Sequence, residues 1–235
     1  MRPGAAVKQT AENSESCETG TALADYRPSS SCHAAPALPC QPSTWGGARN
    51  RADRTSESLS DRQVAALISA AQTAFDSDRV FQRHWTVHYG LAGIQPSDGA
   101  RFVGRLLDMV AKQARRDGGR MTALWVRECA SGKGEHVHIL LHLPAGMTLK
   151  NRTRRWIKAA GGSWSAGASK VTIIGGRLSK VEGNIEARQR ANAANVLRYV
   201  LKAASAETGT ALDLSRAGCC GRIVGKRCGW TQNLG

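Results

Sequence analysis

The sequence predicts an α+β fold in which helices lie against an antiparallel sheet. Residues 81–89, 121–128 and 136–143 combine apolar and β-branched residues in short runs that alternate with a period of two, which is typical of strands. Residues 60–75 and 97–119 instead repeat apolar residues at a spacing of three and four, which is typical of helices. The interspersed order of the two patterns indicates one mixed fold.

The expected elements follow a β-α-β-β-α-β order, with one further helix at each end. In chain order we expect a helix over residues 60–75, a strand over 81–89, a helix over 97–119, strands over 121–128 and 136–143, a helix over 148–162, a strand over 169–174 and a helix over 192–205. Ser60 with Gln63 forms a capping-box pattern at the first helix, and Ser97 and Gly118 mark the expected ends of the second. This order predicts a ferredoxin-like βαββαβ antiparallel sheet with helices on one face and the other face open.

Residues 1–57 differ in composition from the rest of the chain. They hold five of the seven prolines and many Ser, Ala and Gly, and they show no apolar period. Such a segment cannot bury enough apolar surface to offset the entropy lost on ordering, so we expect a disordered tail over residues 1–57. Residues 58–235 then form one domain, with its core at about residues 80–205. We expect neither a membrane span nor a secretory signal, and therefore a cytoplasmic protein.

The charge balance indicates a polyanionic partner. The chain has 33 Lys and Arg against 18 Asp and Glu, a formal net charge of +15 and a pI of about 10.2. Residues 150–202 alone hold 12 Lys and Arg against Glu182 and Glu186. Nucleic acid is the first expected partner, ahead of an anionic membrane surface. We expect four basic residues of this region to contact DNA: Arg154, Arg155, Lys158 and Arg198.

The seven cysteines match no common zinc pattern, and their odd number argues against a disulfide framework. We therefore expect them to be reduced. A metal site at Cys219, Cys220 and Cys228 stays open as an alternative.

The stretch GEHVHILLHLP, residues 134–144, holds three of the six histidines. Alternate side chains of a strand share a face, so His136, His138 and His142 lie on one face and the apolar residues between them on the other. The apolar face should pack on the helices, which leaves the histidines where a ligand can reach them. His136 and His138 are therefore candidate metal ligands, and the alternative is a pair of histidines in the core.

A divalent metal needs more than two imidazoles, and Glu128 is the candidate for the third ligand. If the hairpin register pairs Glu128 with His136, the two side chains share a face. A slip of one residue would turn Glu128 to the other face. We expect His142, four residues beyond His138, to be too far away to bind the same ion. The alternative for Glu128 is a solvated acid at the end of a strand.

The last expected helix carries a second set of polar residues. Tyr199 and Lys202 are three residues apart and share one helical face, and Asn195 lies one turn earlier on the same stripe. The alternative is a tyrosine that packs on the sheet while Lys202 extends to solvent.

These elements together resemble the HUH endonucleases, and among them the single-tyrosine replication initiators of rolling-circle plasmids and phages. The resemblance covers roughly residues 80–205: HWTVHY is similar to the first strand motif, HVHILL to the His-x-His motif and YVLK to the nucleophile helix. The first motif keeps only Thr86 of the family's Thr-Leu-Thr, and Asn195 stands where two-tyrosine members have a second tyrosine. No G-x-x-x-x-G-K-[ST] nucleotide loop occurs.

The resemblance implies a bacterial enzyme that nicks single-stranded DNA at an origin. It implies that His136, His138 and Glu128 hold Mg²⁺ or Mn²⁺, and that Tyr199 attacks phosphorus with help from Lys202, giving a 5′-phosphotyrosine and a free 3′-OH. It also implies a host helicase and polymerase as partners. The Tyr199 of a second protomer, in a dimer, is one hypothesis for the second strand transfer. A relaxase or single-tyrosine transposase would use the same chemistry, and a non-catalytic DNA-binding protein on the same fold is the remaining alternative.

Overall fold

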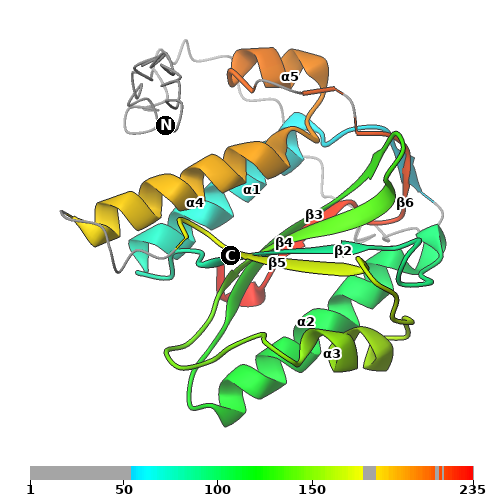
Figure 1. Cartoon of the computed structure of the whole chain (residues 1–235). Helices are drawn as coiled ribbons and strands as arrows, with labels where there is room; N and C mark the ends of the chain where they lie inside the picture. Colours follow the sequence, from blue (N-terminus) through cyan, green and yellow to red (C-terminus); the bar gives the residue numbers. More distant parts are fainter. Residues whose placement is uncertain (1–53, 177–183, 215–216, 219, 235) are drawn as a thin grey trace, which may run out of the picture. The chain divides into compact units, whose positions relative to one another are not determined.

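A five-stranded antiparallel sheet lies at the centre of the computed structural model, which describes residues 54–176, 184–214, 217–218 and 220–234 (Figure 1). The strands stand in the order β5-β2-β4-β3-β7, and each pair of neighbours is antiparallel. They are β2 (Arg83–His88), β3 (Thr122–Ala130), β4 (Gly134–His142), β5 (Ser169–Ile173) and β7 (Cys228–Trp230). A smaller sheet pairs β1 (Thr55–Ser56) with β6 (Ile223–Val224).

Helices cover both faces of the five-stranded sheet (Figure 1). The helices that do so are α1 (Asp61–Asp76), α2 (Gly99–Arg116), α3 (Thr153–Ala159) and α4 (Ile185–Leu201), and α5 (Ala206–Ala211) follows α4. The crossover helices α2 and α3 pack on the face that carries Val137 and Ile139, whereas α1 and α4 pack on the face that carries Leu140.

The prediction that one face of the sheet is open is therefore wrong. Leu124 and Val126 of β3 lie beside Leu140 of β4 on that face and make part of it apolar. Burial of apolar surface stabilises the folded protein, and α1 and α4 bury this part of the sheet. The helices before and after the βαββαβ unit thus complete a second core cluster.

The register of the central hairpin agrees with the prediction. Glu128 of β3 lies opposite His136 of β4, and Val126 lies opposite His138. Because side chains alternate along a strand, Glu128, His136 and His138 share one face. The intervening Val137 is fully buried on the other face, as expected.

The helix boundaries agree with the sequence patterns in part. Ser60 and Gln63 form both hydrogen bonds of a capping box at the start of α1, as predicted. The second helix starts later than expected, because a 3-10 turn at Pro96–Asp98 precedes it and Asp98 is its N-cap instead of Ser97. Helix α3 begins only at Thr153, because Asn151 has a φ of 63° and this left-handed conformation interrupts the expected helix.

The ordered domain extends beyond the predicted core at both ends. Thr55 and Ser56 form β1, so the prediction of a tail up to residue 57 is wrong for residues 54–57, while residues 1–53 lie outside the described part of the chain. At the other end β7 adds a strand beside β3. Within the described residues, no helix combines the length and apolarity that a membrane crossing needs.

A buried arginine of the sheet hydrogen-bonds the C-terminal segment. Arg127 of β3 is fully buried and donates from Nη1 to the carbonyl oxygens of Val224, at 2.8 Å, and Lys226, at 2.9 Å. Its guanidinium also pairs with Glu135 of β4. The segment around β6 is therefore part of the domain, since a buried guanidinium needs these acceptors.

Candidate functional site

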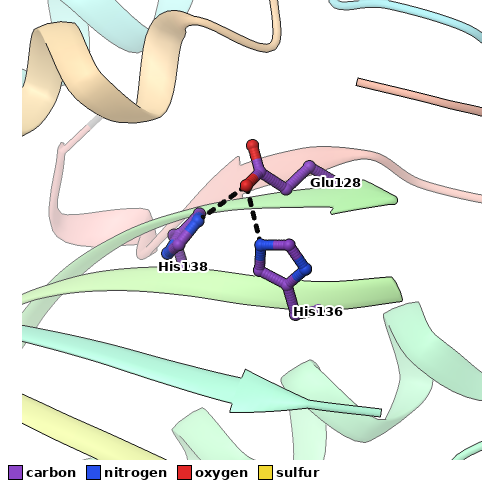
Figure 2. Close-up of side chains that lie close together, drawn as sticks. All are labelled: Glu128, His136 and His138. Carbon is purple, nitrogen blue, oxygen red and sulfur yellow. Dashed lines mark hydrogen bonds and ion pairs between the residues drawn. The ribbon is translucent and has the colours of Figure 1, made fainter. Parts of the chain in front are cut away.

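Strands β3 and β4 bring the three predicted metal ligands together (Figure 2). Nε2 of His136 lies 2.7 Å from Oε1 of Glu128, and Nε2 of His138 lies 2.9 Å from the same oxygen. The three side chains are almost wholly buried, with 1% of Glu128, 3% of His136 and 4% of His138 exposed. The alternative of a solvated strand-end acid is therefore excluded for Glu128.

The donor atoms of this group suit a divalent cation. One ligand atom from each of the three residues lies within 4.8 Å of the others, and no second group of His, Cys, Asp or Glu with such spacing occurs in the described residues. Two ligands at right angles on an ion, each at about 2.1 Å, are about 3 Å apart. The separations of 2.7 and 2.9 Å between imidazole and carboxylate atoms are close to this value.

The hydrogen-bond partners of His136 and Glu128 are also consistent with a bound cation. Nδ1 of His136 lies 3.0 Å from the carbonyl oxygen of Gly134, so both ring nitrogens of His136 face acceptors. A neutral imidazole has one N–H and cannot donate to both, so this arrangement needs an additional positive charge, either a second ring proton or a cation bound between Nε2 and the carboxylate. In addition, Oε2 of Glu128 is buried without a hydrogen-bond partner among the described residues, and it points away from both rings in Figure 2.

The protonation states favour ligation. Burial alone would raise the pKa of the Glu128 carboxyl, but the hydrogen bonds from His136, His138 and Lys202 outweigh burial and hold this pKa well below its usual range. Burial lowers the pKa of His138 and outweighs the contribution of Glu128. A charged carboxylate and a neutral imidazole at neutral pH are the forms that bind metals.

Helix α4 and its C-cap residue place the predicted tyrosine and lysine beside the same group. Nζ of Lys202 lies 2.9 Å from Oε1 of Glu128 and 3.3 Å from the hydroxyl oxygen of Tyr199. Val200 and Leu201 pack into the core between α4 and the sheet. Tyr199 is 42% exposed and lies beside the buried group. Burial alone would lower the pKa of Lys202, but the pairing with Glu128 raises it, so the ammonium stays charged.

Strand β2 adds polar residues that the sequence patterns did not single out as site residues. Nε2 of His84 lies 2.9 Å from Nδ1 of His138, and Oγ1 of Thr86 lies 3.1 Å from the same nitrogen. The ring of His88 lies 5.1 Å, centroid to centroid, from the ring of His136. Burial, reinforced by the neighbouring His138, lowers the pKa of His84 to about 4. The alternation in RHWTVH could have indicated these residues, because it places all three side chains on one face of the strand.

Several predicted site residues lie away from this group. Arg154, Arg155 and Lys158 are exposed on α3, which packs on the opposite face of the sheet, so their contact with DNA stays a prediction. Arg198 of α4 hydrogen-bonds the carbonyl oxygen of Asp213, and its contact with DNA likewise stays a prediction.

Two further predictions concern groups outside the cluster. His142 contacts the carbonyl oxygen of Val80 at 3.0 Å and does not join the group, as expected. Cys220 and Cys228 are buried, and Cys219 lies outside the described residues. The metal site considered for these three cysteines therefore gains no support from the described residues.

Comparison with protein-family models, with curated proteins and with solved structures gives no match to this chain. The chemistry and geometry of the group itself are therefore the basis for inferring a function.

Proposed function

We propose that this protein is a metal-dependent endonuclease of the HUH type, which nicks single-stranded DNA with Tyr199 in the manner of a rolling-circle replication initiator. One observation carries the proposal. The ammonium of Lys202 contacts both the Tyr199 hydroxyl and the Glu128 carboxylate, so an exposed nucleophile and a metal-ligand group form one continuous site. Neither half of the site alone would distinguish DNA cleavage from simple metal binding.

Glu128, His136 and His138 are the residues that would hold the metal. When bound, Mg²⁺ or Mn²⁺ would supply Lewis-acid polarisation of the scissile phosphate. Mg²⁺ prefers oxygen ligands, and Mn²⁺ accepts a mixed set of imidazole and carboxylate more readily, so both ions belong in the test.

Tyr199 and Lys202 have distinct tasks in the proposed reaction. The Tyr199 hydroxyl oxygen forms a bond to phosphorus while the bond from phosphorus to the 3′ oxygen breaks. The phenolic proton passes to solvent, and the departing 3′ oxygen takes up a proton to become a free hydroxyl. Because the pKa of Lys202 is raised, its ammonium acts as a fixed cation that stabilises the phenolate and not as the base. Reversal of the same steps rejoins the strand.

The fold and the charge are consistent with this proposal. The strand order β5-β2-β4-β3, with both crossover helices on one face, is the order of a split βαβ sheet, and we propose the ferredoxin-like topology on this basis. The net charge of +15 favours a polyanionic substrate. Lys170 of β5 lies opposite Thr86 on the face that carries the histidines, which adds positive charge beside the site. Relaxases and single-tyrosine transposases would require the same groups.

A covalent-capture assay tests the proposal. The protein is incubated with a labelled pool of random single-stranded DNA and Mn²⁺, and the products are separated on a denaturing gel. We expect a nuclease-sensitive protein–DNA adduct that disappears in Y199F and H138A and without metal. Y89F is the matched control, because Tyr89 is buried and cannot reach DNA, so its adduct should persist. DNA binding without any adduct would contradict the proposal and favour a non-catalytic DNA-binding protein.

A further inference from the structure

The two histidines of the candidate metal site differ in the hydrogen-bond partners of Nδ1, the ring nitrogen that does not face Glu128. Nδ1 of His136 faces the carbonyl oxygen of Gly134 at 3.0 Å, and a carbonyl can only accept. Nδ1 of His138 instead faces Nε2 of His84 at 2.9 Å and Oγ1 of Thr86 at 3.1 Å. An imidazole and a hydroxyl can each donate or accept, so only His138 has partners that suit either tautomer.

Without a cation, His138 must carry its proton on Nε2. A carboxylate can only accept, and Oε1 of Glu128 lies 2.9 Å from Nε2 of His138. A neutral imidazole has one N–H, so, with this proton directed at the carboxylate, Nδ1 of His138 accepts a hydrogen bond from Thr86 or His84.

A bound cation would require the other tautomer. A metal binds the lone pair of an imidazole nitrogen, so Nε2 of His138 has to lose its proton while Nδ1 gains one. The ring stays neutral and the exchange involves no net uptake or release of protons. The new Nδ1–H then needs an acceptor, and such a partner of a ligating histidine fixes its tautomer and ring orientation.

We propose that His84 and Thr86 are positioning residues that allow His138 to exchange tautomers when a divalent cation binds. The inference rests on the metal site of the proposed function but not on DNA cleavage. His84 is placed for a second contribution, because its ring packs 4.9 Å from the ring of His138 and 6.1 Å from that of Tyr199, centroid to centroid. The rings of His138 and Tyr199 are themselves 5.4 Å apart, so His84 packs beside both the metal ligand and the nucleophile. Thr86 is directly opposite His138 in the β2–β4 register, so its hydroxyl is held by the sheet itself.

The test combines metal affinity with the tautomer of His138, and neither depends on catalysis. Mn²⁺ affinity is measured for the wild type, H84L, T86V, H84L/T86V and H84Q. The tautomer is read from two-bond ¹H–¹⁵N NMR spectra of ¹⁵N-histidine protein before and after Mg²⁺ is added, with H138Q to assign the resonance. H142L is the matched control, because His142 lies on the same strand and loses a hydrogen bond to Val80 without touching the site.

We expect His138 to change from the Nε2–H to the Nδ1–H tautomer with Mg²⁺ in the wild type. The double variant should bind Mn²⁺ about 10- to 100-fold more weakly, the usual effect of removing the partner of a ligating histidine. Each single variant should lose less, because the other partner remains. H84Q should recover much of the affinity through its amide oxygen, and H142L should bind as the wild type does.

The results that would overturn this inference alone can be distinguished from the result that would also overturn the proposed function. Mn²⁺ affinity of a folded double variant within twofold of the wild type, or an unchanged His138 tautomer in the Mg²⁺-bound protein, would refute the role of His84 and Thr86 alone. A wild type that binds neither ion would refute this inference together with the metal site of the proposed function. If the double variant does not fold, the Mn²⁺ affinities of H84Q and H84L are compared instead. Equal affinities of these two variants would also refute the role of His84.

Discussion

Replacement of Lys202 by methionine separates the electrostatic role of this residue from its packing. Methionine keeps an apolar stem of similar length but removes the ammonium that lies 2.9 Å from Oε1 of Glu128. A hydrogen bond to a charged group contributes about 1.5–3 kcal/mol. Glu128 retains His136 and His138 as donors, so we expect the free energy of unfolding to fall by about 2 kcal/mol in EDTA.

A divalent cation should reverse much of this loss. For a domain of about 150–250 residues, 1 kcal/mol shifts Tm by about 2–4 °C, so Lys202→Met should unfold about 4–8 °C below the wild type in EDTA. A cation bound by Glu128 replaces the missing positive charge and no longer competes with the ammonium for Oε1. Mn²⁺ should therefore raise the Tm of the variant by more than it raises that of the wild type.

Thermal unfolding of both proteins in EDTA and in excess Mn²⁺ is the assay. Lys112→Met is the matched control, because Lys112 pairs with Asp108 on the solvent-facing side of α2 and its loss should change stability by less than about 1 kcal/mol. The reasoning would be refuted if Lys202→Met were as stable as the wild type in EDTA, or if Mn²⁺ raised the two Tm values equally.

Three other predictions concern the scaffold. Ser60→Ala removes the capping box of α1 and should lower the free energy of unfolding by about 1 kcal/mol in urea titrations, whereas full stability would show that the cap contributes nothing. Arg127→Leu leaves buried Glu135 unpaired and should lower the free energy of unfolding by about 3–5 kcal/mol. A loss below about 1 kcal/mol would contradict the role of Arg127 in holding the C-terminal segment. Burial raises the pKa of the Cys228 thiol to about 11, so at pH 8 a thiol reagent should modify half-buried Cys129 well before Cys228, and equal rates by mass spectrometry would argue against that burial.

The candidate metal-ligand group of Glu128, His136 and His138 could be predicted because it depends on local geometry. Alternation along one strand places His136 and His138 on the same face, and a short hairpin limits the registers in which Glu128 can join them. The spacing of Tyr199 and Lys202 is likewise a property of one helix. Each of these relations extends over a few residues and is therefore visible in the sequence.

The rest of the site depends on contacts between distant segments. His84 meets His138 only because β2 pairs with β4, 54 residues further along the chain, and no local pattern fixes that register. Strand β7 has three residues, too few for a recognisable alternation. Arg127 has the appearance of a surface charge in the sequence, and its burial follows from carbonyl groups about 100 residues away.

The most direct test of the central claim is to identify the residue that becomes linked to DNA. The adduct formed with single-stranded DNA and Mn²⁺ would be digested with nuclease and protease and analysed by tandem mass spectrometry. The account predicts a 5′-phosphate nucleotide remnant on the hydroxyl of Tyr199, with a free 3′-OH on the released strand. A remnant on any other residue, or cleavage that leaves no covalent intermediate, would contradict it.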